Sequence, residues 1–298
     1  LKASLEAESG AFQRLKLLMD SWCSLYFWPL DQSGNLPSRE AWLAAAEVLL
    51  GIGTDDLATR SMLDIQLGEG IELEELFQAS EHKLPDAERL SELVPWFGVG
   101  RDSSVEHNFH HWELIFSEVL GPKIQEVDSP SGFDIVMGNP PWIPVEFIYQ
   151  TIAYELDPSK AVKRLNSPEA KKVLKSTSGA EKPYVRSLSV ATAGSIAFLG
   201  GRSNYSLLKG VKVNLYRNFV LKSLDLISDI GVSGLLHPEG IYTEENSANL
   251  RGVLYKRLVA KYQFNNDWAG GFFPDADAKE KFGINIYRRA GDIGFDLI

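Results

Sequence analysis

The stretch FDIVMGNPPW, from Phe133 to Trp142, constrains the fold more than any other part of the chain. Its first five residues are mostly apolar and include isoleucine and valine, which predicts a strand over 133–137. Gly138 follows, and then two prolines hold the backbone extended, because a residue before proline is driven out of the helical region. Proline has no N–H, so the carbonyls of this loop are available to a ligand. A strand that leads into a rigid loop of acceptors is typical of a binding site.

The first hundred residues have a helical pattern. Apolar spacing predicts a helix over 10–27 and another over 39–50, with Ser38 as the N-cap of the second. The expected apolar stripe of the first helix consists of Phe12, Leu15, Leu18, Met19, Trp22 and Leu25. Residues 54–94 are acidic and mostly helical in pattern.

Strand-like runs dominate the second part of the chain. They begin near Val105 in HNFHHWELIFSEVL, and further strands are predicted around 232–236 and over 281–289. A helix is predicted over 247–262, with Ser247 as its cap. This order of elements favours an α/β sheet that binds ligands at the carboxyl ends of its strands, which is where the NPPW loop lies.

Length and composition are those of a globular protein of one or two domains. The chain has 298 residues, of which 44% are hydrophobic and 23% charged. Its longest apolar runs, such as Ala41–Ala46, are far shorter than the roughly 20 residues of a membrane helix, so a cytoplasmic protein is expected. The predicted domains are a mostly helical region, 1–104, and a sheet region, 105–298, with a helical insert over about 151–205.

Charge is distributed unevenly along the chain. The net charge is −10, yet residues 159–188 contain eight basic and two acidic residues, a net +6 that leaves −16 for the rest. The basic residues are Lys160, Lys163, Arg164, Lys171, Lys172, Lys175, Lys182 and Arg186. This basic arm is either a solvated helix face or a contact surface for nucleic-acid phosphates.

The NPPW loop has the chemistry to hold an amino group on a planar ring. The amide oxygen of Asn139 and the carbonyl of Pro140 form a pair of fixed acceptors, and Trp142 offers an aromatic face for stacking. Two accepted hydrogen bonds favour the geometry in which the nitrogen lone pair points at an electrophile. A rigid turn followed by a core tryptophan is the alternative.

This stretch resembles the Asn/Asp/Ser-Pro-Pro-Tyr/Phe/Trp motif of S-adenosylmethionine-dependent amino-methyltransferases. Preceded by FDIVMG, it is similar to the adenine-N6 DNA methyltransferases of the large fused restriction-modification methylase family. The resemblance spans roughly residues 11–290. It is supported by the segments HHWELIFSEVL, SNYSLLKGVKVNLYRNFV, GVSGLLHPEGIYTEENSANLRGVL and GGFFPDADAKEKFGINIYRR.

The resemblance implies a partial Rossmann-like methyltransferase sheet with a helical N-terminal part and a helical insert. It implies S-adenosylmethionine as cofactor, double-stranded DNA as partner, and assembly with other restriction or defence subunits. The catalytic motif would consist of Asn139, Pro140, Pro141 and Trp142. Asn139 and the Pro140 carbonyl would hold the N6 amine of a flipped-out adenine, and Trp142 would stack on the base. The expected substrate-binding residues are Phe273 or Phe282 at the base, and Lys163, Arg164, Lys171 and Lys172 at DNA phosphates.

The glycine-rich cofactor loop of this family has no clear counterpart in the chain. The candidates are Gly51-Ile-Gly53, Gly68-Glu-Gly70 and Gly98-Val-Gly100, and none follows a predicted strand. Because the chain begins at Leu1 rather than Met, we expect an internal piece of a longer protein whose cofactor loop lies upstream. The piece is expected to be inactive alone.

Other reactive side chains are not expected to form sites. His107, His110 and His111 lack a cysteine partner and would point to opposite faces of a strand, so no metal site is predicted. Cys23 is expected to be a core thiol. His237 and Glu239 are expected on a surface loop.

Two alternatives to an adenine methylase remain open. One is methylation of another amino or amide nitrogen, in protein glutamine or an RNA base, because the same four motif residues serve there. The other is a non-catalytic DNA-binding or assembly subunit that keeps the fold.

Overall fold

The chain forms two compact units in a computed structural model that describes residues 10–50, 91, 94–121, 131–266, 272–273, 279–289, 291 and 293–298. One unit contains Leu1–Ile115 and Ile148–Gly194, and the other contains Phe116–Phe147 and Ser195–Ile298. The division at 104/105 with an insert over 151–205 stays a prediction. Within the described residues, no helix is both long enough and apolar enough to cross a membrane.

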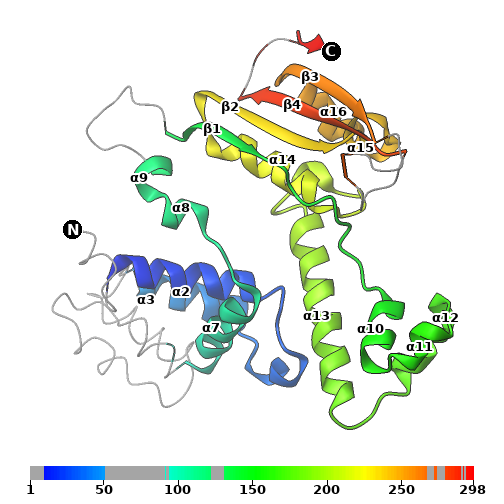
Figure 1. Cartoon of the computed structure of the whole chain (residues 1–298). Coiled ribbons are helices and arrows are strands. Elements are labelled where there is room, and N and C mark those ends of the chain that lie inside the picture. Colours follow the sequence, from blue (N-terminus) through cyan, green and yellow to red (C-terminus); the bar gives the residue numbers. More distant parts are fainter. Residues whose placement is uncertain are drawn as a thin grey trace. The chain divides into compact units, whose positions relative to one another are not determined.

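The first unit is helical in its described residues (Figure 1). Its elements are α2 (Ala11–Ser24), η1 (Leu30–Asn35), α3 (Arg39–Leu50), α7 (Pro95–His107), α8 (Trp112–Ile115), α10 (Tyr149–Leu156), α11 (Ser159–Val162), α12 (Ser167–Lys175) and the greater part of α13 (Glu181–Gly200). Ser38 caps α3 as predicted, because its Oγ accepts a hydrogen bond from the Ala41 N–H at 3.1 Å.

Helix α2 buries a different face from the predicted stripe. Leu15 and Trp22 are exposed, whereas Leu17, Asp20, Ser21 and Ser24 are buried. The reason is close helix packing. A Cβ added to Gly100 of α7 would lie 3.2 Å from the Cα of Ser21, so only small residues fit between the two helices. The predicted stripe was wrong because it counted apolar residues and overlooked small ones.

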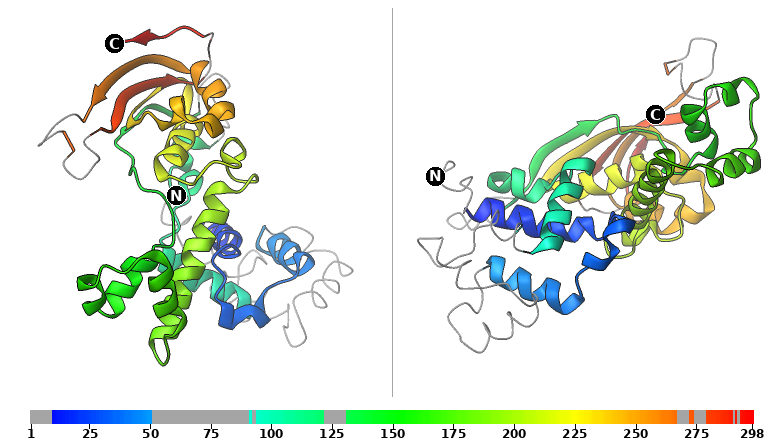
Figure 2. Two further views of the ribbon diagram at one scale, coloured as in Figure 1. Left: turned by 90° about the vertical axis from the view of Figure 1, so that its right-hand side faces the viewer. Right: turned by 90° about the horizontal axis from the view of Figure 1, so that it is seen from below.

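The second unit is built on a mixed five-stranded sheet, which Figures 1 and 2 show with its strong twist. The strands are β1 (Phe133–Gly138), β2 (Ile227–Pro238), β3 (Leu258–Asn265), β4 (Lys281–Arg288) and β5 (Asp296–Leu297), in the order β1-β2-β4-β3-β5. β1 runs parallel to β2, and β4 runs antiparallel to both β2 and β3. β1, β2 and β3 therefore end at the same edge of the sheet, where β4 begins.

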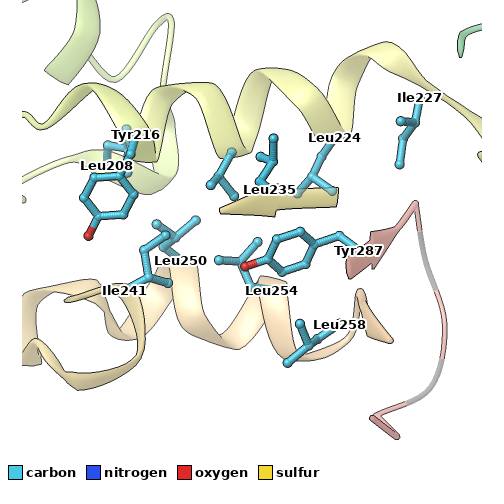
Figure 3. Close-up of a cluster of buried hydrophobic side chains, with 11 residues drawn as sticks. Leu208, Tyr216, Leu224, Ile227, Leu235, Ile241, Leu250, Leu254, Leu258 and Tyr287 are labelled. Atoms are coloured by element: carbon cyan, nitrogen blue, oxygen red, sulfur yellow. The ribbon is translucent and has the colours of Figure 1, made fainter. Parts of the chain in front are cut away.

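Helices cover one face of this sheet and form its core. They are η2 (Ser206–Leu208), α14 (Leu215–Leu226), α15 (Gly240–Thr243), η3 (Glu245–Ser247) and α16 (Ala248–Tyr255). The short helix α9 (Ser117–Leu120) belongs to the same unit and has no buried residue. Figure 3 shows side chains of α14, α16 and the strands meeting in one cluster, among them Leu224, Leu235, Leu254 and Tyr287. Each fully buried leucine contributes about 1.5–3 kcal/mol through the area it removes from water.

This architecture confirms the predicted α/β fold class. The strands predicted at 133–137, 232–236 and 281–289 are all present. The helical pattern of the insert is confirmed by α10 to α13.

Two predicted elements were wrong, and one lies outside the described residues. The run after Val105 forms α8, α9 and the end of α7 rather than a strand, since it contains few β-branched residues. The helix predicted over 247–262 ends at Tyr255, and Leu258 begins β3; apolar residues at every fourth position concealed the change. The pattern over 54–94 lies almost entirely outside the described residues.

Replacing Gly132 by alanine is expected to destabilise the second unit. Gly132 enters β1 with a φ of +121°, and an added Cβ would lie 2.5 Å from the backbone nitrogen of Ser228. The strained backbone and the steric clash of the added Cβ together should lower the free energy of unfolding, measured by urea titration, by about 2 kcal/mol or more. Gly252→Ala is the control: it lies in α16 with no atom near the added Cβ and should stabilise by about 0.4–1 kcal/mol. A neutral Gly132→Ala would contradict this description of the turn.

Candidate functional site

The NPPW loop follows β1 at the edge of the sheet where β1, β2 and β3 all end. Asn139 and Pro141 are exposed, Pro140 is buried, and Trp142 is half-buried. The loop thus lies at the position that α/β proteins use for ligands, as the sequence predicts.

Backbone pairing ties the loop to the start of α14. Pro144 forms an antiparallel bridge with Asn214. On either side, the Val145 N–H donates to the Val213 carbonyl and the Leu215 N–H donates to the Ile143 carbonyl, both at 3.1 Å. This short ladder holds two segments far apart in sequence side by side. It brings the first turn of α14 next to the motif.

Three aromatic side chains gather beside the motif. The Trp142 and Phe273 rings lie 4.9 Å apart between centroids, Trp142 and Phe282 5.6 Å, and Phe273 and Phe282 5.1 Å. Asn266 holds Phe273 in place with two hydrogen bonds to its backbone, of 2.9 and 3.1 Å. The structure therefore brings both expected phenylalanines to the motif tryptophan. Phe282 is only 3% exposed and packs in the interior, whereas Phe273 lines the adjoining cavity.

The motif opens onto a cavity of about 610 Å³, within the usual size range of small-ligand sites. Its walls come from the loop over 139–143, the start of α14, the segment after β2, and the residues Phe273 and Glu280. The cavity thus combines motif acceptors, aromatic faces and polar side chains.

An ion pair forms one wall of the cavity. Arg217 of α14 is 3% exposed, and its guanidinium lies 2.5 Å from the Glu244 carboxylate. It also donates to the Tyr216 hydroxyl and the Lys212 carbonyl, each at 3.1 Å. Gly240 makes room for this arrangement, since an added Cβ would lie 2.6 Å from a Glu244 oxygen. The sequence analysis missed this wall.

A buried hydrogen-bond network on β2, β4 and α15 adjoins the cavity wall, where the His237 ring stacks on that of Tyr216. The side chain of His237 contacts the Pro238 carbonyl and the Tyr287 hydroxyl, both at 2.8 Å. Tyr287 contacts Tyr242 at 2.6 Å, and Tyr242 donates to Asn285 at 2.9 Å. The expectation of a surface loop at His237 was therefore wrong. β2 continues two residues beyond its predicted end, so His237 points into the core.

Glu239 is also buried, contrary to the same expectation. Its carboxylate pairs with Lys261 at 2.5 Å, and the Lys261 ammonium lies 4.3 Å from the centre of the Tyr242 ring. These contacts compensate the charge of both groups in the interior. The contacts of His237 and Glu239 thus hold the segment from Pro238 to Gly240, which lines the cavity.

Burial keeps the hydroxyls and the imidazole of this network neutral. It lowers the pKa of His237 to about 4, and it raises the pKa values of Tyr242 and Tyr287 above the ordinary value for tyrosine. None of these groups is charged near neutral pH, so the network fixes geometry beside the cavity rather than supplying charge.

The basic arm lies in the other compact unit, on α11, α12, α13 and their connections. Lys163, Arg164, Lys171 and Lys172 are all exposed. Asn166 and Glu169 close a capping box at the start of α12, with two hydrogen bonds of 2.9 Å, so this helix is well defined.

The remaining candidates were the histidines, Cys23 and the Gly-x-Gly turns, of which the structure describes only a part. No cluster of metal-binding side chains occurs among the described residues, and His111 is buried against Asp20 at 2.7 Å. Cys23 is half-buried, and burial raises the pKa of its thiol to about 11. Gly98 and Gly100 lie inside α7; the other two Gly-x-Gly turns fall outside the described residues.

Comparison with known proteins gives little further information. No protein-family model matches the chain, and no curated protein matches it. One solved structure with a distant likeness is described as a modification subunit of a type I restriction enzyme from Vibrio vulnificus YJ016, with 13% identity and a TM-score of 0.27. The match covers 87% of this chain and 60% of that protein. A likeness this weak carries no inference about function.

His237→Gln is expected to remove part of the acid sensitivity of folding. The pKa of His237 is about 4 when folded and near 6.5 when unfolded, so its stabilising effect is present above pH 6.5 and is lost as the pH falls to 4. Between these limits the wild type should lose about 3 kcal/mol more than the variant in urea titrations. Parallel losses in the two proteins would contradict a neutral, buried imidazole.

Proposed function

We propose that the chain carries the target-base pocket of a DNA methyltransferase that methylates adenine at N6 in a restriction-modification or phage-defence system. One observation carries the proposal: Asn139, Pro140, Trp142 and Phe273 line the same cavity at the carboxyl edge of the sheet. Partner subunits of such a system, and a cytoplasmic location, belong to this proposal.

In the proposed mechanism the loop binds and orients the amine. The Asn139 amide oxygen and the Pro140 carbonyl accept the two N6 hydrogen bonds, and the rigid backbone prevents these acceptors from moving apart. The nitrogen lone pair then points away from the loop. No general base is required, because the proton can leave after the nitrogen has gained its methyl group.

The aromatic side chains offset the energy of base flipping. Extruding a base from a duplex costs a few kcal/mol. Stacking on an aromatic ring contributes about 1–3 kcal/mol per base, so Trp142 and Phe273 can offset much of that cost. The Trp142 ring is kept in place by its Nε1–H, which donates to the Leu236 carbonyl at 3.4 Å.

S-adenosylmethionine would supply the electrophilic methyl group. The described residues contain no glycine-rich loop after a strand, so no residue here is assigned to hold it. The part played by this chain is therefore confined to binding and orienting the base.

The basic arm is proposed to contact DNA phosphates. Its exposed cations have the side chains that nucleic-acid backbones attract, in a chain that is otherwise acidic. This favours DNA over a protein substrate. A non-catalytic DNA-binding subunit would use the same arm. The methyltransferase is distinguished from it only by a loss of methyl transfer when the motif is changed.

Asn139→Ala is expected to abolish methyl transfer without unfolding the protein. The change removes one of the two acceptors, and misplacing a reacting group lowers rates by about 100-fold or more. Because Asn139 is exposed, the free energy of unfolding should change by less than about 0.5 kcal/mol. Transfer of a radiolabelled methyl group to DNA by the full gene product measures the effect.

Asn139→Asp is the matched control, since it keeps an acceptor oxygen at the same position and should retain part of the activity. Binding of DNA should be preserved in both variants. If Asn139→Ala leaves methyl transfer unchanged, the proposed role of the loop is wrong. If the wild type binds DNA but transfers no methyl group to it, the non-catalytic alternative holds.

Removing charge from the arm should weaken DNA binding in a salt-dependent way. The double variant Lys163→Ala and Lys172→Ala should lower the slope of log affinity against log salt by about 1 for each lost phosphate contact. The test is fluorescence anisotropy at several salt concentrations, with exposed Lys209→Ala outside the arm as control. An unchanged slope would indicate that the arm is a solvated helix face that does not contact DNA phosphates.

A further inference from the structure

Asn214 occupies a helix-capping position without capping the helix. It is the N-cap residue of α14, yet its side chain makes no capping hydrogen bond. Asparagine is among the preferred N-cap residues because its side-chain oxygen can accept from the first turn. Asn166 does this at the start of α12, where it accepts from the Glu169 N–H at 2.9 Å. Stability of α14 therefore does not explain why asparagine stands at 214.

Asn214 instead belongs to the wall of the cavity beside the motif. Asn214 is half-buried and lines the same cavity as Asn139. Its Oδ1 is buried and has no hydrogen-bond partner among the residues that the structure describes. Buried polar atoms are nearly always paired, and an exception at a cavity wall points to a missing ligand.

The backbone fixes this carboxamide relative to the motif. The bridge between Pro144 and Asn214, with its two flanking hydrogen bonds of 3.1 Å, joins the segment of Asn214 to the end of the NPPW loop. Asn139 and Asn214 line the same cavity, so one ligand can contact both. Because Oδ1 has no partner among the described residues to fix the orientation of the carboxamide, a ligand can select its donor or its acceptor.

We propose that Asn214 is a specificity-determining residue whose carboxamide hydrogen-bonds a ring nitrogen of the purine held by Asn139. This inference rests on the proposed function. In that function both hydrogens of the exocyclic amine are taken by Asn139 and Pro140, which leaves the ring nitrogens as the groups still to be recognised. Asparagine suits this task, since it offers a donor to a purine ring nitrogen.

The test measures the binding of short single-stranded oligonucleotides to the full chain by fluorescence anisotropy. Their adenines are kept, or are replaced by purine without the amino group, by 1-deazaadenine or by 7-deazaadenine. Single strands make the bases available without the cost of flipping. The wild type should bind adenine about threefold to tenfold more tightly than one of the two deaza analogues, as expected for one hydrogen bond.

Asn214→Ala should remove this discrimination while keeping the preference for the amino group. Its urea unfolding midpoint should not fall, because no capping bond is lost. Asn218→Ala on the same helix is the control. It loses the 2.8 Å hydrogen bond that its side chain donates to the Leu199 carbonyl, so its midpoint should fall while discrimination persists.

Two outcomes overturn the inference and separate it from the proposed function. In the first outcome the wild type prefers adenine to purine, but either it binds both deaza analogues as tightly as adenine, or Asn214→Ala discriminates against the same deaza analogue as the wild type. The proposed role of Asn214 is then wrong, and the proposed base pocket stands. If the wild type does not distinguish adenine from purine, the pocket does not recognise the amine, and both proposals fail.

Discussion

The parallel register between β1 and β2 determines where every part of the candidate site lies. Gly138 pairs with Leu235, so the loop after β1 and the segment after Pro238 emerge at the same edge. β4 is inserted in the opposite direction, and its first residues meet the end of β2, where Phe282 pairs with Pro238. A slip of one residue in either pairing would turn the motif and its aromatic partners to opposite faces.

Rigidity at this edge comes from three different sources. Two prolines restrict the loop itself, and the short ladder to the start of α14 restricts its far end. Beside the cavity, a network of neutral groups anchored by His237 holds the segment after β2. The described charged groups at and around the cavity are the Arg217–Glu244 and Lys261–Glu239 pairs and Glu280. A site organised in this way is suited to positioning a neutral planar group rather than to acid-base chemistry.

Sequence reasoning singled out the motif that lines the cavity but not the other cavity walls. Local chemistry and a family resemblance both pointed to the motif, whereas the resemblance alone pointed to Phe273 or Phe282. Asn214 and Arg217 were missed, since a pairing between distant segments that no local pattern reveals brings the start of α14 to the cavity. Glu244 was missed because only its ion pair with Arg217 relates it to this wall. His237 was misplaced by an error of two residues in the end of a strand. Element boundaries are the weakest part of such predictions. Here the predicted end of β2 placed His237 on the surface, whereas the strand continues and His237 is buried.

The most direct test of the central claim is to map modified bases in cells. The complete gene would be expressed in a host whose DNA lacks N6-methyladenine, and that DNA would be read by single-molecule sequencing. The account predicts N6-methyladenine at one recurring short sequence, and no such mark when Asn139 is replaced by alanine. Unmethylated DNA in cells that contain the folded protein, or methylation confined to another base, would contradict it.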